Sequence, residues 1–419
     1  MTRRRIAVIG SGVAGLTAAY VLQREADVTL YEAADRLGGH ADTHDIVGTD
    51  GVLRSIDTGF IVHNLRTYPN LRRLFDELGV ATQESDMSMS VSCAGCGLEY
   101  AGGRGISGLL PSARALANPR YLKLLGEVVR FHRRAHEVLT GTEHELTIRE
   151  FLRRHRFSAY FETHFMTPLI AAVWSTAPTG AGDYPARYLF TFLDNHGMLS
   201  VTGAPVWYTV TGGSARYVET AAKGLTSVQT STPVRSVTRV GWGVEIHDDA
   251  DSLESFDAAV IASHPHQALG MLSAPTHTET EVLGAIGYTS NPTVLHTDTS
   301  VLPRGPRVQA SWNYALPACD SVPGVVQVSY NMNRLQRLDA AQTYVVTLNA
   351  EDRVDASTVL DRMSYEHPVY TTASVAARER LPLLNDEVVA FAGAYHGWGF
   401  HEDGCRSGVE AAKSLGVRW

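Results

Sequence analysis

The sequence predicts an α/β fold in two lobes, one built around a parallel sheet and the other of mixed α+β character. Three observations support this prediction. An apolar run at residues 6–9 is followed at once by a glycine pattern, residues 10–15, and then by a helix-forming stretch. A second apolar run, residues 27–31, ends at an acidic residue, Glu32. The chain has 419 residues, which is enough for about two or three domains.

The glycine pattern after the first apolar run is a G-x-G-x-x-G turn, and its strand-to-helix setting predicts a Rossmann-like nucleotide-binding unit. Gly10 permits the tight turn, Gly12 lets the backbone approach a pyrophosphate, and Gly15 lets helix and strand pack closely. The helix start at Val13 and Ala14 carries the partial positive charge that holds the anion.

Glu32 stands 22 positions after Gly10. A carboxylate at this place accepts hydrogen bonds from ribose hydroxyls and repels a 2′-phosphate. A second glycine pair, Gly38 and Gly39, follows a few residues later and lets another stretch of backbone close over the pyrophosphate. An extended FAD molecule needs this second contact, whereas a dissociable NAD does not. The sequence therefore predicts FAD as the cofactor.

At these residues the chain resembles the flavin-containing amine oxidase and phytoene desaturase superfamily. There an acidic residue is soon followed by R-x-G-G and then by a D-x-G turn beside the flavin, and Asp57 begins such a turn here. The resemblance implies a Rossmann-like FAD-binding domain with a mixed α+β substrate-binding domain. It also implies cofactor contacts from the residues around the two motifs: Ala33, Arg36, His40, Thr58, Gly59 and Phe60.

The order of the predicted elements divides the chain into two discontinuous domains. We expect the FAD-binding domain to consist of residues 1–80, 211–275 and 376–419, where short apolar strands and glycine turns recur. Residues 81–210 contain longer helical patterns and 276–375 a mixed β pattern. We expect these two segments to form the substrate domain, whose sheet would make one wall of the cavity.

Three helices are predicted in the first part of the chain. Residues 69–79 have apolar residues on one face, proline in the first turn and glycine at the end. Residues 121–139 and 147–156 are longer helical stretches within the substrate domain.

Strand patterns occupy much of the second half. Residues 228–247 alternate between apolar and polar, and 257–262 form an apolar run typical of a buried strand. Residues 293–298 and 311–314 have strand patterns in the substrate domain, and a last strand begins at Val388.

The C-terminal segment resembles the last FAD motif of the superfamily, a strand, a loop and a helix that we expect to open at about Gly404. The resemblance implies cofactor contacts from Gly393, Gly404 and Cys405, and a backbone contact of Val234 with the adenine. Cys405 would lie near the flavin edge, although a noncovalent cofactor is the default.

This last motif departs from the superfamily at one point. Many relatives carry an acidic residue after the F-A-G of the strand, where it binds the ribityl chain, but Ala394 and Tyr395 follow Gly393 here. Glu402 or Asp403 could replace that contact, or either could cap the helix.

Four cysteines are too few for a disulfide framework in a chain of this length, which favours a reducing cytoplasm. Cys93 and Cys96 form a lone C-x-x-C, and tetrahedral zinc needs four ligands, so we expect an incidental loop pair. His132 and His136 have helical i, i+4 spacing, but no third ligand is evident nearby. The sequence therefore predicts no metal site.

Composition and charge exclude several classes. With 44% hydrophobic and 19% charged residues, the chain is neither disordered nor collagenous. A net charge of −8 gives no electrostatic reason for a nucleic-acid partner. No apolar stretch of about 18 residues is present, so we expect no spanning helix, and any membrane contact would be peripheral.

Within the superfamily, the chain is most similar to bacterial FAD-binding oxidoreductases associated with fatty-acid modification genes. Stretches that carry this resemblance include Asp57 to Asn64, Thr211 to Ser214 and Trp312 to Tyr314. The resemblance implies hydride exchange between flavin N5 and a carbon of a hydrophobic, lipid-like substrate, by desaturation, saturation or double-bond isomerisation. The alternatives are a flavin amine oxidase and a non-catalytic FAD-binding partner protein. The external electron donor or acceptor stays open.

Such a reaction needs a proton donor or acceptor near the substrate, and histidine or tyrosine suits that role near neutral pH. His63, His296 and Tyr314 lie in family-like segments that flank the predicted cavity, and they are the candidate catalytic residues. Each also has a structural alternative. His63 could be a loop histidine and His296 a hydrogen-bonded core residue.

Overall fold

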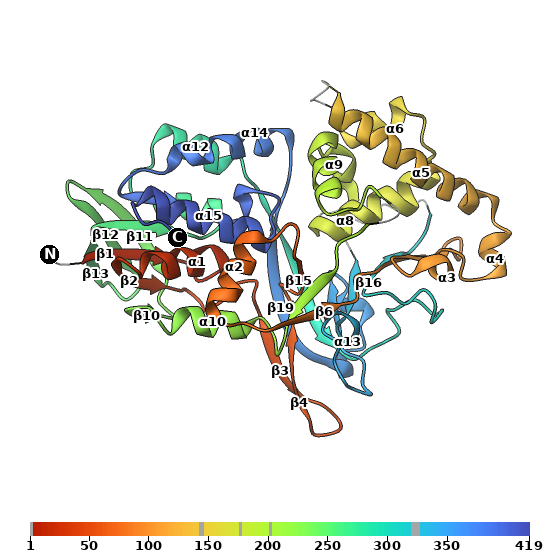
Figure 1. The fold of residues 1–419 in the computed structure, drawn as a ribbon, viewed down its shortest axis with the longest axis horizontal. Helices are drawn as coiled ribbons and strands as arrows, with labels where there is room; N and C mark the ends of the chain where they lie inside the picture. Colours follow the sequence, from red (N-terminus) through yellow and green to blue (C-terminus); the bar gives the residue numbers. More distant parts are fainter. Residues whose placement is uncertain (1–2, 142–145, 176–177, 201–202, 320–326) are drawn as a thin grey trace.

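The computed structural model describes residues 3–141, 146–175, 178–200, 203–319 and 327–419, and it has two lobes side by side (Figure 1). Both ends of the chain lie in one lobe, together with the first and last helices. The second lobe contains the helices of the middle of the chain above a large sheet.

The first lobe is built on a five-stranded sheet in which all pairs are parallel. In spatial order, its strands are β10 (Ser227–Gln229), β2 (Ala26–Tyr31), β1 (Arg4–Ile9), β14 (Ala258–Ile261) and β20 (Val389–Phe391). Because side chains alternate along a strand, Ile6 and Val8 face one hydrophobic cluster while Ala7 and Ile9 face another. The sheet is therefore buried on both faces, as the continuous apolar runs predict.

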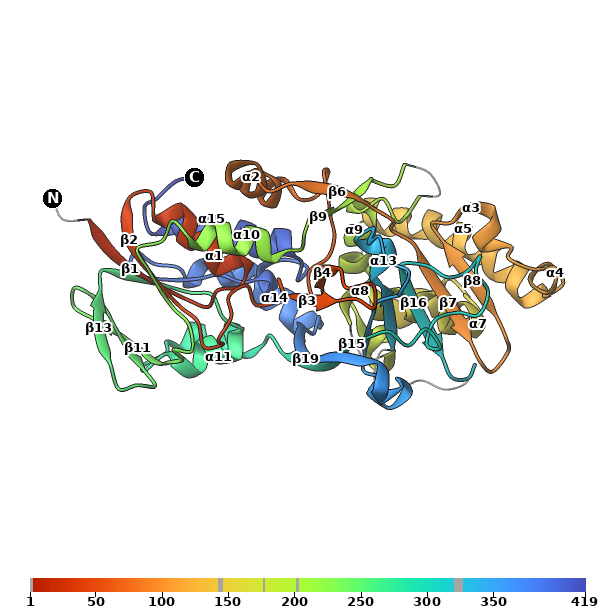
Figure 2. The same ribbon diagram turned by 90° about the horizontal axis from the view of Figure 1, so that it is seen from below.

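Different elements cover the two faces (Figure 2). One face carries helices α1 (Val13–Leu22), α2 (Pro69–Leu78), α10 (Ala215–Ala222) and α15 (His401–Ser414). The other carries the antiparallel sheet β11 (Val234–Val240), β12 (Gly243–Asp248) and β13 (Leu253–Phe256), with helices α11 (Pro265–Met271), α12 (His277–Gly284) and α14 (Thr372–Arg380). The predicted helix at 69–79 is confirmed, and Gly79 ends it in the left-handed conformation at φ 65°.

The boundary predicted at residue 275 is corrected by α12. Val282 and Leu283 of this helix pack in the same hydrophobic cluster as Ile261 of the parallel sheet. The first lobe therefore continues past residue 275, because these apolar side chains close the core beneath β14.

The second lobe is built on a mixed seven-stranded sheet. Its spatial order is β19 (Val359–Pro368), β15 (Tyr288–His296), β18 (Val345–Leu348), β17 (Val328–Asn331), β16 (Trp312–Leu316), β7 (Met89–Cys93) and β8 (Glu99–Gly102). Within this sheet, only the pair β16 and β7 is parallel among the described strands. Strands from residues 89–102 and from residues 288–368 thus share one sheet.

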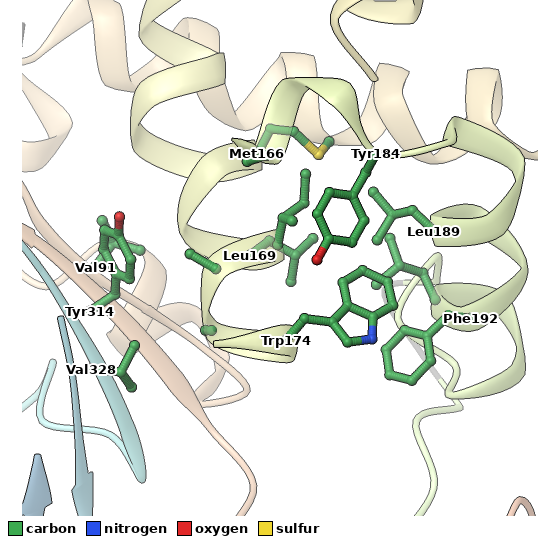
Figure 3. Close-up of a cluster of buried hydrophobic side chains, with 14 of the residues drawn as sticks. Val91, Met166, Leu169, Trp174, Tyr184, Leu189, Phe192, Tyr314 and Val328 are labelled. Atoms are coloured by element: carbon green, nitrogen blue, oxygen red, sulfur yellow. The ribbon is translucent and has the colours of Figure 1, made fainter. Parts of the chain in front are cut away.

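Helices cover this sheet and are joined to it by a large hydrophobic cluster. They are α3 (Gly105–Leu109), α4 (Ala113–Leu116), α5 (Pro119–Thr140), α6 (Ile148–Arg154), α7 (Ala159–Phe161), α8 (Thr167–Trp174) and α9 (Ala186–Asn195). Figure 3 shows Val91, Tyr314 and Val328 on the sheet side of this cluster and Trp174 and Phe192 on the helical side. The helices predicted at 121–139 and 147–156 correspond to α5 and α6. None of the described helices combines the length and apolar character needed to cross a bilayer.

Two further small sheets belong to neither of the two large sheets. One is the hairpin of β3 (Thr43–Val47) and β4 (Leu53–Asp57), and the other joins β5 (His63–Asn64), β9 (Trp207–Val210) and β6 (Thr82–Ser85). They carry the segments that follow the glycine motifs.

Candidate active site

The two glycine motifs of the sequence lie against each other in the structure. Gly12 and Gly38 form an isolated parallel bridge, and the Gly38 amide donates to the carbonyl of Ser11 at 3.2 Å. A side chain at Gly15 would place its Cβ 1.9 Å from the Gly10 carbonyl oxygen. A Cβ at Gly12, in contrast, would meet no protein atom within 4 Å. Gly15 therefore serves strand–helix packing, whereas Gly12 borders open space.

The Glu32 carboxylate is held at the end of β2 by three donors. One oxygen accepts from the amide of Ser11 at 2.9 Å and from its hydroxyl at 2.5 Å, and the other accepts from the amide of Ala34 at 2.9 Å. The Glu32 carbonyl accepts from the Thr232 amide at 2.9 Å. This bond holds the segment that precedes β11 next to Glu32. Val234, the half-buried first residue of β11, follows two residues after Thr232. The adenine contact of Val234 stays a prediction.

Asp42, which follows the second glycine pair, connects the motif to the other lobe. Its carboxylate pairs with Arg36 at 2.8 Å and accepts from the hydroxyl of Tyr365 at 2.8 Å. Tyr365 comes from β19 and is also bonded to the Thr58 hydroxyl at 2.6 Å. Burial raises the pKa of Asp42, but the hydrogen bonds and charges of His44 and Arg36 outweigh it, so the pKa lies below its usual value.

A buried carboxylate joins the D-x-G turn to the T-G-G-S stretch. Asp57 accepts from the amide and hydroxyl of Ser214, both at 2.8 Å, and from the hydroxyl of Thr43 at 2.6 Å. Its other oxygen accepts from the Gln336 amide at 3.1 Å. Burial raises the pKa of Asp57 to about 6 despite these donors. Asp57 thus acts as a structural centre for the turn that contains Thr58, Gly59 and Phe60.

Gly59 and Phe60 bring the N-terminal motifs to the C-terminal one. A Cβ at Gly59 would lie 2.2 Å from the carbonyl oxygen of His40, to which the Phe60 amide donates at 2.6 Å. The Phe60 ring stacks on His401, with centroids 3.7 Å apart and an interplanar angle of 12°. His401 is bonded to the Tyr217 hydroxyl at 3.1 Å, and burial lowers its pKa well below the usual value.

A histidine cluster lies where the lobes meet. The His40 ring is 5.1 Å from Tyr365, 5.5 Å from His367 and 6.3 Å from His264. His264 is also bonded to the Glu366 carboxylate at 2.7 Å. Burial and then the charge of His264 lower the pKa of His40 to about 4, so this ring is neutral at neutral pH.

Sequence reasoning did not include Tyr365, Glu366 or His367 among the site residues. They lie in a strand of the other lobe, and no local motif marks them. For His264, the one available signal in the sequence is its position soon after the buried strand β14.

The C-terminal helix begins at His401, three residues before the predicted start at Gly404. The Asp403 carboxylate accounts for this correction, since it accepts from the amides of Trp398 at 2.9 Å and Phe400 at 3.1 Å and so caps the first turn. Glu402 instead accepts from the amides of Asn70 and Leu71, at 3.1 and 3.0 Å, at the start of α2. Both acidic residues therefore have helix-capping roles in this structure.

Gly404 and Cys405 pack against α1. A Cβ at Gly404 would lie 2.6 Å from a methyl of Val13, so the glycine permits close helix packing. The Cys405 thiol is fully buried and accepts from the hydroxyl of Thr17 at 3.5 Å. The assignment of Cys405 as a cofactor contact is therefore corrected for its side chain, because the thiol is enclosed within the core of the lobe.

The residues of the first lobe fit a bound FAD. In addition to the open space at Gly12, several buried polar atoms of this lobe have no hydrogen-bond partner among the described residues: the Ser263 hydroxyl, the Tyr395 hydroxyl and Nε2 of His396. Ser263 follows β14 next to Gly10, and Tyr395 packs over Gly393. Unsatisfied buried donors and acceptors of this kind are typical of a site that holds a polar ligand.

His63 is the sequence-predicted catalytic residue with a free nitrogen. It lies in β5 and is 1% exposed, and its Nδ1 has no hydrogen-bond partner in the described part of the chain. Its ring contacts Phe75 at 5.3 Å and Tyr208 at 6.0 Å. Burial lowers the pKa of His63 to about 4, with a smaller contribution from Arg72, so the ring is neutral at neutral pH.

In His296, by contrast, both ring nitrogens are hydrogen-bonded. Its Nδ1 accepts from the Asp298 amide at 3.1 Å, and Nε2 is bonded to the Thr347 hydroxyl at 2.8 Å. His296 is the last residue of β15, whereas Tyr288, the first residue of this strand, stacks on His264 of the histidine cluster. At about 3.3 Å per residue, the eight residues between them place His296 about 26 Å along the strand from Tyr288. The catalytic role of His296 stays a prediction, and the two hydrogen bonds favour its structural alternative, a hydrogen-bonded core residue.

Tyr314 lies on β16, separated from β15 by two strands, so about 14 Å of sheet separates it from His296. The Tyr314 hydroxyl is buried and has no hydrogen-bond partner among the residues that the structure describes, and burial raises the pKa of Tyr314. The structure thus does not bring the three predicted catalytic residues into one cluster. Tyr314 stays a candidate for contacting substrate from the sheet.

The model of one protein family, described as flavin containing amine oxidoreductase, matches residues 13–318. Coproporphyrinogen III oxidase from Mycobacterium tuberculosis is 39% identical over 88 residues. That similarity covers 20% of this chain and 18% of the length of the mycobacterial protein.

Solved structures of the same fold match almost the whole chain. Cyclohexylamine oxidase from Brevibacterium oxydans superposes with a TM-score of 0.70 at 16% identity, covering 99% of this chain and 98% of the other. A CLA-producing fatty acid isomerase from P. acnes superposes with a TM-score of 0.69 at 17% identity, covering 99% of both chains.

Proposed function

Because the chain belongs to the family of flavin-containing amine oxidoreductases and is an FAD-dependent oxidoreductase, we propose that its substrate is a hydrophobic, lipid-like molecule. The reaction would be desaturation, saturation or double-bond isomerisation of that chain. Bound FAD would supply hydride exchange at its N5 position. The observation that carries the proposal is an aromatic layer where the second lobe meets the segment before α15.

This aromatic layer joins α8 and α9 to the C-terminal motif. The Trp174 indole donates to the carbonyl of Trp398 at 2.9 Å, and the Tyr188 hydroxyl donates to that of Gly397 at 2.8 Å. Phe192 stacks on Phe400 with centroids 4.9 Å apart. The Trp174 and Tyr188 polar atoms are thus bonded to backbone, whereas the buried Trp398 indole nitrogen has no partner among the described residues, and most of the layer consists of ring surface. Such surfaces favour an apolar substrate.

The distribution of lysines argues against an amine substrate. In the amine oxidase cavities that this chain resembles, a lysine lies near flavin N5. The three lysines of this sequence, Lys123, Lys223 and Lys413, are all exposed on helices or at a helix end.

His63 is the proposed proton carrier. Its ring is neutral, and its Nδ1 has no partner among the described residues, so it is able to accept a proton from a reacting group. The rings of Phe75, Tyr68 and Tyr208 hold it in an apolar surrounding that excludes water. The resemblance of the fold to a fatty acid isomerase supports a lipid chain as the molecule that this site converts.

The test uses the purified flavoprotein mixed without oxygen with fatty acids of different unsaturation, with primary amines and with a porphyrinogen. We expect a fatty acid to bleach the visible flavin band, or to be isomerised with the flavin reoxidised, as product chromatography would show. Rapid bleaching by an amine or the porphyrinogen, with no conversion of any fatty acid, would overturn the lipid proposal and leave the oxidoreductase assignment intact.

A further inference from the structure

We propose that Cys93, Cys96, His164 and Cys319 bind a zinc ion in the second lobe, away from the parallel sheet that carries the glycine motifs. Each residue offers one sulfur or nitrogen atom, and these four atoms all lie within 4.8 Å of one another. Three thiols and one imidazole form a ligand set that structural zinc prefers. The sequence predicted no metal because two of the four ligands are distant from the C-x-x-C pair.

The distances agree with tetrahedral coordination. Zinc bonds of about 2.3 Å to sulfur and about 2.0 Å to nitrogen place two sulfurs about 3.8 Å apart, and sulfur and nitrogen about 3.6 Å apart. In the structure, the sulfurs of Cys93 and Cys319 are 3.6 Å apart, and Cys96 Sγ is 3.7 Å from Nε2 of His164. A disulfide needs about 2.05 Å between sulfurs, so the thiols are arranged around a common centre and not as a bonded pair.

The turn between β7 and β8 presents the C-x-x-C pair. The Gly97 amide donates to the Cys93 carbonyl at 2.9 Å, and Gly97 has a positive φ of 69° that closes the turn. The Cys93 amide donates to the Leu98 carbonyl at 2.8 Å. This tight turn directs both thiols of one short segment to the same side, which is the use of C-x-x-C in zinc sites.

The pairing of β16 with β7 places the third thiol, that of Cys319, near the C-x-x-C pair. β16 runs parallel to β7, with Leu316 opposite Cys93, and Cys319 follows three residues later. The Ala94 amide donates to the Leu316 carbonyl at 2.9 Å. A Cβ at Gly95 would lie 3.0 Å from the Ala318 Cα, so glycine lets the two segments meet.

The imidazole comes from a helical segment with a π-type turn, Glu162–Met166. Nδ1 of His164 lies 3.1 Å from the Tyr160 carbonyl, and this bond requires the proton on Nδ1. The lone pair of Nε2 then faces Cys96. A backbone carbonyl that fixes the tautomer of a ligating histidine is the usual outer contact of a zinc ligand.

An ion here would have four protein ligands and no open position, so its role would be structural. It would join the helical segment around residue 164 to the β7–β8 turn and to the end of β16. Cys96 also lines a cavity of about 300 Å³ with Leu98, Pro111 and Asn118, which gives an ion a route from solvent. This inference does not depend on the substrate of the enzyme.

The experiment measures metal in the full-length flavoprotein, produced with zinc in the medium and purified under reducing conditions. We expect about one zinc per chain by mass spectrometry of the metal. Cys96→Ser and His164→Ala should each lower the zinc content per chain at least tenfold. Cys405→Ala, at the one cysteine outside the cluster, should leave the zinc content unchanged.

Because a ligand variant could fail to fold, zinc-edge X-ray absorption of the wild type gives a second readout. Three sulfur neighbours and one nitrogen neighbour would support the site. Absence of stoichiometric zinc in the folded wild type, a shell of oxygen and nitrogen only, or a Cys93–Cys319 disulfide in peptide mass spectra would each overturn it.

Discussion

The hydroxyl of Tyr365, on strand β19, donates a 2.8 Å hydrogen bond to the carboxylate of Asp42, which lies three residues after the second glycine pair, Gly38 and Gly39. The same hydroxyl accepts from Thr58 at 2.6 Å, while Arg36 pairs with the carboxylate. One tyrosine of the seven-stranded sheet thus holds two motif segments of the first lobe. The geometry of the flavin site therefore depends on the docking of the two lobes.

Replacing this hydroxyl should weaken the junction. We expect Tyr365→Phe to lower the free energy of unfolding by about 1–3 kcal/mol, because Asp42 and Thr58 lose a buried partner. Urea denaturation of the holoprotein would measure this. Tyr20→Phe is the matched control, since its hydroxyl bonds Glu77 at the surface. Equal effects of the two changes would contradict a special role for Tyr365.

The two glycines of the first motif should respond differently to the same change. Gly12→Val should give a folded protein without bound flavin, since a Cβ at this position enters open space with no protein atom within 4 Å. Gly15→Val should fail to fold, because its Cβ would overlap the Gly10 carbonyl. Flavin absorbance and circular dichroism distinguish the cases. Gly224→Val, also at an open position, is the control and should keep its flavin. Normal flavin content in Gly12→Val would contradict the prediction that the backbone at Gly12 contacts the pyrophosphate of FAD.

His63→Gln should lower turnover at least tenfold while flavin content stays near that of the wild type. The reason is that the neutral imidazole, with its unpartnered Nδ1, is the proposed proton carrier, and general acid–base catalysis contributes about 10²–10⁴-fold. Steady-state kinetics with the substrate found by the flavin assay would measure it. His136→Gln, at an exposed histidine, is the control. Unchanged turnover in the His63 variant would contradict a catalytic role and leave His63 with a structural role only.

His296→Ala should instead affect stability alone. Both ring nitrogens are bonded within the sheet, so their loss leaves the Thr347 hydroxyl and the Asp298 amide without this partner. We expect a lower Tm and a turnover per bound flavin within about twofold of the wild type. A tenfold loss of turnover in a variant with normal flavin content would reinstate a catalytic role.

Acid should loosen the histidine cluster. Burial, with the charges of His40 and His264, lowers the pKa of His367 to about 3, whereas an unfolded histidine has its usual value near 6.5. The unfolded state therefore takes up a proton first. The stability that neutral His367 provides is present above about pH 6.5 and is lost as the pH falls towards 3.

We expect His367→Gln to reduce the drop in Tm between about pH 7 and about pH 5 by roughly 2–4 °C. Calorimetry at the two pH values would measure this difference. The exposed His136→Gln variant should keep the wild-type drop, and an unaltered drop in His367→Gln would show that other groups cause the acid sensitivity.

The sequence by itself determined the local elements and the first half of the candidate site. The strand, glycine turn and helix at residues 6–22, the acidic end of β2 and the helix that ends at Gly79 follow from periodicity and turn chemistry, which act within one segment. The register that places Gly12 beside Gly38 also follows from this short-range order.

Only the tertiary structure decided which distant residues meet. The bond from Tyr365 to Asp42, the free nitrogen of His63 against the fully bonded His296, and the approach of His164 to Cys96 depend on strand order and lobe docking. These contacts join segments that are about 50 to 320 residues apart in the chain, so no local pattern carries them. Their geometry is set by the packing of the whole core, in which every sheet and helix face must be buried at once.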